Sequence, residues 1–398
     1  MPRYNGGFIG TDGLDAPDPP TIDSVTADDQ QLSIAFTAPT DTGTSAITGF
    51  VAQVASSGDN YSAGSNTGSS SPIVVSSLSN GTSYTAKVWA INAYGTSAPS
   101  DASDGVSPGL QRGIFAGGNR GSSTDVIQYV NIASAGNATD FGDLYAAGHD
   151  GAGFSSSTRG IFAGAYDSGG NYDDTIQYIT IASTGNTTDF GDVSYDNIDS
   201  PRGCSNSTRG LFAGGNDRNN IDYVTIASTG NSQDFGDLTQ NSYKGASAAS
   251  STRGIFYETN NGGTGSNTIS YVTIASTGNA SDFGDQTETR SRCAACSSAT
   301  RALNGGGFGG SVRTNAVDYI TIASTGNASD FGSLTVIRES LASCSSATTG
   351  IWAGGDNNVS DVIDQVTMAS TGNATDFGDL LTAQRNHMSC SSAHGGLQ

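Results

Sequence analysis

Basic residues are scarce in this 398-residue chain, which carries 16 Lys and Arg against 37 Asp and Glu and has a net charge of −21. Contacts to nucleic-acid phosphates require clustered Lys and Arg, so the composition excludes nucleic acid as a partner. Only 13% of the residues are charged, whereas glycine alone contributes 55 residues and Ser, Thr and Asn are abundant. This composition predicts an all-β protein of short strands joined by tight turns.

Long apolar runs are also missing. No segment approaches the roughly 20 apolar residues of a membrane-spanning helix, and the first residues, Met1–Phe8, lack the apolar core of a signal peptide. An acidic surface would also repel anionic membranes, so we expect no membrane insertion. The expected location is the cytoplasm or a virus particle, which leaves the cell without a signal peptide.

The five cysteines do not form the pattern of a disulfide framework. Four of them occupy one position of a repeat, six residues before the residue that opens the next repeat, and other repeats hold Phe or Ala there. These residues are Cys204, Cys296, Cys344 and Cys390, with Phe154 and Ala248 as their equivalents. A position that accepts Cys, Phe or Ala is typical of buried packing, so we predict free thiols. Cys293 and Cys296 are three apart and would point to opposite faces of a strand, so no metal or redox function is expected.

The region that follows residue 15 has the pattern of a β-sandwich. Leu32–Phe36 and Ile47–Val54 alternate between apolar and polar residues, which predicts strands with one buried face. A Gly-containing turn followed by Tyr84 is the tyrosine-corner pattern, in which the Tyr hydroxyl bonds to the preceding turn. Residues from about 17 to 107 resemble a fibronectin type III domain, with Phe36 where that family usually has Trp. The resemblance implies a spacer or adhesion module without catalytic chemistry.

The rest of the chain consists of six copies of one repeat. Each repeat opens with a short apolar strand that ends in glycines, of which Arg209–Gly215 is the clearest example. The opening positions are Gly113, Gly160, Gly210, Gly254, Ala302 and Gly350. An Asp-Phe-Gly marker recurs with them at Asp140, Asp189, Asp234, Asp282, Asp330 and Asp376. Each repeat is interpreted as four short strands, and its length is typical of a propeller blade.

The order of features within the repeat resembles the kelch repeat, which has a strand ending in Gly-Gly, a Tyr, a tight turn and an aromatic residue. Phe235 and its equivalents stand where kelch repeats usually carry Trp, and the sixth repeat has Gln365 in place of Tyr. The segment around Cys390 repeats a first-strand sequence, whereas the first repeat begins without one. We therefore predict an N-terminal arm (1–15), a fibronectin type III-like sandwich (16–108) and a six-bladed kelch-like β-propeller (109–398) that the C-terminal strand closes.

Motifs that suggest chemistry lack the surroundings that the chemistry needs. Asp-Phe-Gly also occurs in protein kinases, but six copies without a catalytic-loop signature exclude that function. The Gly-rich run 305–310 lacks the Gly-Lys-Ser/Thr of a phosphate loop. Asp376 and Asp379 are candidates for calcium ligands, with capping of the turn backbone as the alternative that we favour. His387 and His394 lie on the predicted closing strand and His149 in a variable loop, so their nitrogens are not expected to converge. No enzymatic activity, metal or cofactor is therefore expected.

Comparison of the repeats separates constant from variable connections. Two turns, Ser-Ser-x-x-Arg-Gly and Ser-Thr-Gly-Asn, are nearly identical in every repeat, whereas the other two connections vary. Antiparallel strands place the two kinds on opposite rims, and a single variable rim is typical of a binding surface. Aromatic rings beside Asp and Arg suit sugars. The candidate ligand-binding residues are Tyr145, Tyr166, Tyr172, Asp174, Tyr195, Tyr243 and Arg338.

The Gly-rich start, the type III module and the Arg-Gly-Ile-Phe-Ala-Gly-Gly repeats together resemble virion structural proteins of marine bacteriophages, such as tail, fibre or head-decoration components. The resemblance implies a non-enzymatic virion protein that is made in the host cytoplasm and forms a homo-oligomer. The arm and sandwich would attach to other virion proteins, and the propeller would bind host surface polysaccharide or a neighbouring subunit. The alternative is a secreted or surface carbohydrate-active propeller enzyme.

Overall fold

The computed structural model describes residues 14–28, 30–80, 82–106, 108–167, 169–194, 198–216, 218–259 and 265–397. Within these ranges the regular elements are strands, apart from one short 3-10 helix, η2 (Gly395–Leu397), so the predicted all-β class is confirmed. The chain divides into two compact units, Met1–Leu110 and Gln111–Gln398. In the described part of the chain, no helix is long and apolar enough to cross a membrane.

The first compact unit is a sandwich of two antiparallel sheets. One sheet has the order β1-β2-β5 (Thr21–Asp28, Gln31–Thr37, Ile73–Ser76). The other has the order β4-β3-β6-β7 (Gly64–Gly68, Ile47–Ala55, Thr85–Asn92, Gly95–Thr96). Alternate residues of β2, β3 and β6 are buried in a shared core. The hydroxyl of Tyr84 accepts a hydrogen bond of 3.1 Å from the backbone N–H of Ser79, which is the predicted tyrosine corner.

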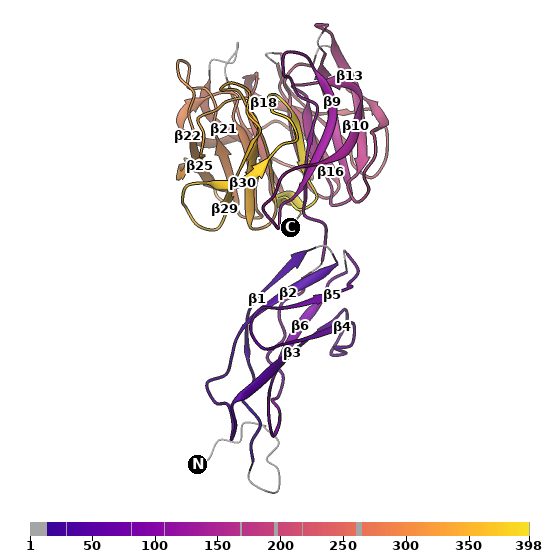
Figure 1. Ribbon diagram of the computed structural model, residues 1–398. Coiled ribbons are helices and arrows are strands. Elements are labelled where there is room, and N and C mark those ends of the chain that lie inside the picture. The colour runs from indigo at the N-terminus through magenta and orange to yellow at the C-terminus, as the bar shows by residue number, and fades with distance from the viewer. Residues whose placement is uncertain are drawn as a thin grey trace. The chain divides into compact units, whose positions relative to one another are not determined.

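The second compact unit contains six four-stranded antiparallel sheets, one for each repeat. The first comprises β31 (Met388–Ser391), β8 (Arg112–Ala116), β9 (Thr124–Asn131) and β10 (Thr139–Gly148); the second comprises β11 (Ala152–Ser155), β12 (Arg159–Tyr166), β13 (Tyr172–Thr180) and β14 (Thr188–Asp192). The third comprises β15 (Arg202–Ser205), β16 (Arg209–Ala213), β17 (Arg218–Thr225) and β18 (Gln233–Ser242); the fourth comprises β19 (Ala246–Ala249), β20 (Arg253–Tyr257), β21 (Ser266–Thr273) and β22 (Ser281–Arg290). The fifth comprises β23 (Ala294–Ser297), β24 (Arg301–Gly305), β25 (Ala316–Thr321) and β26 (Ser329–Ser333); the sixth comprises β27 (Ala342–Ser345), β28 (Thr349–Ala353), β29 (Val362–Thr367) and β30 (Thr375–Asp379). These sheets fit the blades of a β-propeller (Figure 1).

The C-terminal strand belongs to the first sheet, as the sequence predicted. β31 pairs antiparallel with β8, so that Met388 lies opposite Ala116 and Ser391 lies opposite Gly113. The first strands of successive sheets also contact one another, in the order β11, β15, β19, β23, β27 and β31, and β31 contacts β11. The N-terminal and C-terminal ends of the repeat region therefore meet within one sheet.

The Asp-Phe-Gly marker and the Ser-Thr-Gly-Asn turn bind each other across every junction between sheets. In the third sheet, the carbonyl of Phe235 accepts a hydrogen bond of 2.7 Å from the N–H of Gly278 in the fourth. The side chain of Asn279 accepts a second, of 3.1 Å, from the N–H of Asp237. The equivalent Asn residues are Asn186, Asn231, Asn327, Asn373 and Asn137. The last of them joins the sixth sheet to the first, so all six junctions share one geometry.

A stacked arginine adds a second contact at five of the junctions. Arg209 lies 4.4 Å from the centre of the Tyr223 ring in its own sheet and donates a hydrogen bond of 2.7 Å to the carbonyl of Ile274 in the next. The same contact involves Arg112, Arg159, Arg253 and Arg301. The sixth repeat has Thr349 and Gln365 at these two positions. Because Arg and Tyr are lost together, the pair behaves as one element, for which a cation–π contact of about 0.5–1 kcal/mol is typical.

Serine hydroxyls and thiols fill the spaces between the first strands. The Ser205 hydroxyl donates to the carbonyl of Ser155 in the preceding sheet at 2.7 Å, and four other serines repeat this contact. All five cysteines are free and buried, as predicted. Burial raises the pKa of Cys204 to about 12, so its thiol stays protonated. In the fifth repeat Ala302 replaces the opening glycine and adds a methyl group. Ala248, which is smaller than the Cys or Phe at its position in other repeats, lies in the same core cluster, so the packed volume is conserved.

Deleting residues 388–398 is expected to destabilise the second compact unit strongly. The deletion removes the hydrogen-bonding partner of β8 and the buried side chains of Met388 and Cys390. Loss of a buried Met alone costs about 2–5 kcal/mol, and an uncovered strand edge promotes aggregation. Thermal unfolding and size-exclusion chromatography measure both effects. Ser391→Ala, which removes one hydroxyl contact, is the control and should cost only about 1 kcal/mol. Unfolding at the same temperature as the full chain would contradict the role of β31.

Gly236→Ala is expected to destabilise the protein more than Gly230→Ala. Both glycines have a positive φ, of 146° and 153°, so both substitutions carry backbone strain of about 1–3 kcal/mol. A Cβ at Gly236 would also lie 2.5 Å from the carbonyl oxygen of Gly278 across the junction, whereas a Cβ at Gly230 meets nothing within 4 Å. Chemical denaturation of the two variants measures the difference. Equal losses of stability would mean that the two sheets can move apart at the junction to make room for the added Cβ.

Candidate functional site

Six equivalent residues share a left-handed backbone conformation where the fourth strand of one sheet leads to the first strand of the next. They are Asp150, Ser200, Lys244, Arg292, Ser340 and Asn386, with φ between 57° and 61°. Because five different residue types adopt one conformation at these six positions, the fold and not the side chain imposes it. We call them the mouth residues, because residues that follow them, such as Gly151, Cys293 and Leu341, line a cavity of about 80 Å³ between the first strands.

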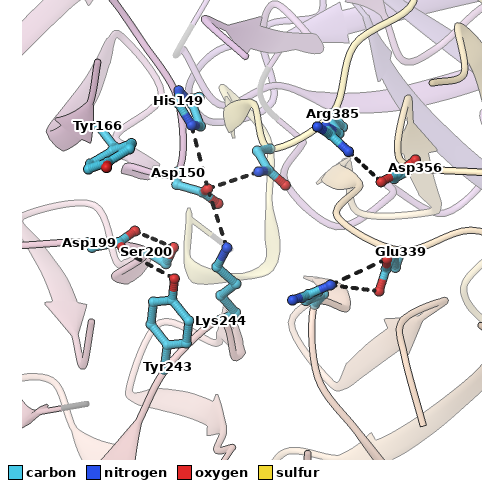
Figure 2. A network of polar contacts seen from close by, with 12 residues as sticks. His149, Asp150, Tyr166, Asp199, Ser200, Tyr243, Lys244, Glu339, Asp356 and Arg385 are labelled. Carbon is cyan, nitrogen blue, oxygen red and sulfur yellow. Dashed lines mark hydrogen bonds and ion pairs between the residues drawn. The ribbon is translucent and has the colours of Figure 1, made fainter. Parts of the chain in front are cut away.

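Backbone hydrogen bonds connect neighbouring mouth residues. The N–H of Asp150 donates to the carbonyl of Asn386, that of Asn386 to Ser340, and that of Ser340 to Arg292, each at 2.8 Å. Arg292 donates in the same way to Lys244. Five connections are therefore held in register beside this cavity, at its end that we call the opening. Figure 2 shows Asp150, Lys244 and several neighbouring side chains there.

Asp150 is the centre of one half of this opening. Its side chain is 5% exposed and lies 3.6 Å from the ammonium of Lys244. Lys244 is on the connection after that of Ser200, and its side chain extends toward Asp150 (Figure 2). The amide of Asn386 donates to the same carboxylate at 2.9 Å, and the ring of His149 lies 4.0 Å away. Burial lowers the pKa of His149, so its imidazole is neutral at pH 7. Asp150 therefore has Lys244 as its cationic partner.

Tyr243 and Asp199 form a further polar pair at this opening. The Tyr243 hydroxyl donates to the Asp199 carboxylate at 3.1 Å, and the hydroxyl of Ser200 donates to its other oxygen at 2.7 Å. Burial raises the pKa of Tyr243, with the negative charge of Asp199 acting in the same direction. The phenol therefore remains a hydrogen-bond donor at neutral pH. Figure 2 shows this pair on the side of the opening away from Arg385.

Three arginines and two carboxylates form the other half of the opening. Arg292 and Arg313 both contact Glu339, at 3.3 and 3.2 Å, whereas Arg313 and Arg385 both contact Asp356. Each of the three arginine side chains is more than a third exposed, but Glu339 is only 4% exposed. The carboxylates thus lie beneath a layer of accessible guanidinium groups.

An aromatic cluster lies where the second sheet reaches the same rim. The ring of Tyr166 lies 5.5 Å from that of His149 and 5.2 Å from that of Tyr172. The hydroxyl of Ser123 lies 2.9 Å from Nδ1 of His149, which fixes the orientation of the imidazole. Tyr172 is 38% exposed. The cluster therefore offers partly accessible ring faces beside the polar opening.

The structure brings some of the predicted site residues together and separates others. Tyr166 and Tyr172 share the aromatic cluster, and Tyr243 lies at the opening. Tyr145 is 83% exposed on β10, and Asp174 is exposed on β13; neither has a described side-chain contact with the cluster. Tyr195 lies outside the described residues. The prediction omitted four charged residues of the opening. Asp150 and Lys244 are mouth residues, Glu339 precedes one, and Asp356 lies on the connection between β28 and β29.

Arg338 corrects the prediction, because its side chain is fully buried and cannot be an accessible ligand contact. It pairs with the buried Asp364 at 2.7 Å and donates to the carbonyls of Gly354, Val362 and Trp352. Arg290 forms the equivalent pair with Asp318 in the neighbouring sheet. Both arginines stand two residues before a mouth residue, and both aspartates occupy one position of the repeat. Aligning the repeats on these positions would have identified the pair from the sequence.

Asp222 and Glu258 are buried carboxyl groups that lack such an arginine. Asp222 accepts hydrogen bonds from the hydroxyls of Ser194 and Ser232, and Glu258 accepts them from those of Ser270 and Thr239. Burial raises the pKa of both carboxyl groups, despite these hydrogen bonds. A group whose folded pKa is raised favours folding at low pH and opposes it above that pKa.

Asp222→Asn is therefore expected to stabilise the protein at pH 7 and to lose this advantage as the pH falls below 4. The amide removes the cost of a buried ionisable group while its oxygen still accepts the two serine hydroxyls. Asp364→Asn is the matched control and should destabilise the protein by about 3–5 kcal/mol, because it leaves the buried charge of Arg338 unpaired. Denaturant unfolding at several pH values tests both variants. A pH-independent difference for Asp222→Asn would disprove the titration of this carboxyl.

Two histidines flank the C-terminal strand. His387 and His394 lie at opposite ends of β31, and burial lowers their pKa values to about 3 and about 4. Nε2 of His394 lies 3.1 Å from the carbonyl of Ser155, beside a second cavity of about 60 Å³ between the first strands. Among the residues that the structure describes, no group of three His, Cys, Asp or Glu side chains could hold a metal ion.

Comparison with known proteins identifies the first compact unit. Residues 15–106 match the Fibronectin type III domain family. This part of the chain is a fibronectin type III domain. Its two sheets and its tyrosine corner agree with the match. No curated protein matches the chain. The six-sheet unit lies outside the bounds of the type III match, so nothing about its rim follows from the family.

Proposed function

We propose that this chain is a non-enzymatic structural protein of a bacteriophage particle whose variable rim binds a saccharide of the host surface or a neighbouring subunit. In this proposal the second compact unit is a six-bladed kelch-like β-propeller closed by its C-terminal strand. The type III domain and the N-terminal arm attach it to other particle proteins. The contrast between identical junctions and a variable rim carries the proposal.

The recurring junction contacts support the propeller assignment. The bond from the turn glycine to the Phe carbonyl occurs six times, and the sixth copy joins Gly136 to Phe377 at opposite ends of the repeat region. The pairing of β31 with β8 adds a second link between these ends. Joining the last sheet to the first covers strand edges that would otherwise be exposed.

The side chains around the opening support saccharide binding. Tyr166 and Tyr172 provide ring faces of the kind that pack on the C–H groups of sugars. Tyr243, Asp199 and Asn386 provide donors and acceptors for hydroxyl groups. A rigid backbone holds these groups, which lowers the entropy lost on binding.

The pairing of the carboxylates favours binding over catalysis. Asp150 forms an ion pair with Lys244. Glu339 forms ion pairs with Arg292 and Arg313, and Asp356 forms them with Arg313 and Arg385. A general acid or base needs a proton that it can exchange near the working pH. These carboxylates are oriented by the cations that they contact, which suits the positioning of a ligand.

The double variant Tyr166→Ala/Tyr172→Ala is expected to bind immobilised bacterial surface polysaccharides at least tenfold more weakly than the unmodified chain. Its melting temperature should change little, because both residues lie at strand ends and substitutions on the surface usually stay within about 0.5 kcal/mol. Tyr94→Ala, at a residue 50% exposed on the type III domain, is the matched control. Glycan-array binding and circular dichroism measure the two properties.

Unchanged array binding by the double variant would place recognition elsewhere. Release of sugars from a bound polysaccharide would favour the carbohydrate-active enzyme instead. Mass spectrometry of purified phage particles tests the structural role independently, because a particle protein must be present in them at a fixed ratio to the other components.

A further inference from the structure

Cationic side chains gather at one place in an otherwise acidic protein. The chain has 16 Lys and Arg, and its net charge is −21. Seven of these residues are used inside the second compact unit, five in the stacked arginine contacts and two, Arg290 and Arg338, in buried pairs. Four others, Lys244, Arg292, Arg313 and Arg385, lie around the opening. The opening therefore gathers a quarter of the basic residues of the chain, beside the carboxylates that they contact.

The three arginines are not fully neutralised by their partners. They share two carboxylates, Glu339 and Asp356, because Arg313 contacts both, so three positive charges face two negative charges. Arg292 and Arg385 each use Nη1 for these contacts, and in the described part of the chain Nη2 of each has no hydrogen-bond partner. Both side chains are more than a third exposed.

We infer that this arginine cluster binds the anionic group of an acidic saccharide, a carboxylate or a sulfate, while the neighbouring side chains bind its hydroxyls. The inference rests on the proposed function and names the ligand class of the same opening. A planar guanidinium with unused N–H groups matches the oxygens of a carboxylate or sulfate. The Tyr243 and Asp199 oxygens, across the opening, can accept hydrogen bonds from uncharged sugar hydroxyls (Figure 2).

The negative net charge of the whole chain opposes the binding of acidic polymers. A protein of net charge −21 repels polyanions at long range, so a retained acidic polymer needs a local cationic contact. Such a contact weakens with added salt, because the screening length falls from about 10 Å at 0.1 M to about 3 Å at 1 M ionic strength. Binding of a neutral polymer through aromatic rings lacks this dependence.

The test compares three soluble polymers on the full chain. Polygalacturonate carries carboxylates, dextran sulfate carries sulfates, and dextran is neutral. The variant is Arg292→Gln/Arg385→Gln, which leaves Arg313 in contact with both Glu339 and Asp356, so neither carboxylate loses its last cation. Arg3→Gln/Lys87→Gln is the control, because it changes the net charge equally at two residues of the first compact unit. Isothermal titration at 0.1 M and 1 M salt measures affinity, and a thermal melt verifies folding.

We expect the unmodified chain and the control to bind at least one acidic polymer at 0.1 M salt, and the Arg292/Arg385 variant to bind it at least tenfold more weakly. Preference for polygalacturonate or dextran sulfate then identifies the anionic group. Equal binding of the acidic polymers by the variant would overturn the inference, as would binding of dextran alone, although the latter leaves the proposed saccharide function intact. If the unmodified chain binds none of these polymers and no glycan on the array, both this inference and the proposed saccharide binding are overturned.

Discussion

The contact between the Asp-Phe-Gly strand and the neighbouring Ser-Thr-Gly-Asn turn is the constraint on which the second compact unit depends. A sheet of four short strands has too little core to be stable alone, so each must be covered by its neighbours. The Phe235 carbonyl and the Asn279 amide make this contact with hydrogen bonds, and Gly236 lacks a side chain because the next backbone is too close for one. The identities of Asn279 and Gly236 therefore follow from one geometric requirement.

The same constraint separates structural from variable positions. Stacked arginines, serine hydroxyls and buried thiols all join one sheet to the next, and they use the rim and the strands that recur in every repeat. The connections at the opposite rim take no part in these contacts and can differ between repeats. The mouth residues show the limit of that freedom. Lys244 and Asp150 differ in chemistry but share one strained backbone conformation and one hydrogen-bonded chain.

Much of the fold could be predicted from the sequence because it depends on local pattern. Alternation in Leu32–Phe36 and Ile47–Val54 located strands β2 and β3, and the turn before Tyr84 located the tyrosine corner. The position shared by four cysteines identified buried packing sites. The candidate site was predicted less well. Tyr166, Tyr172 and Tyr243 lie at the opening, but Arg338 is buried with Asp364, because a charged residue in a variable connection can fold inward when a partner is there.

The sequence alone determined the repeat, its four strands, the pairing of the C-terminal strand and the division between constant and variable connections. These features follow from spacing and from residue types that favour a particular backbone, which are properties of short segments. Only the tertiary structure decided which side chains meet at the opening. Glu339 and Arg292 belong to different connections, as do Asp150 and Lys244, and their contacts arise from the packing of whole sheets. Charge pairing across such distances in sequence has no local signal, so it becomes visible only when the chain is folded.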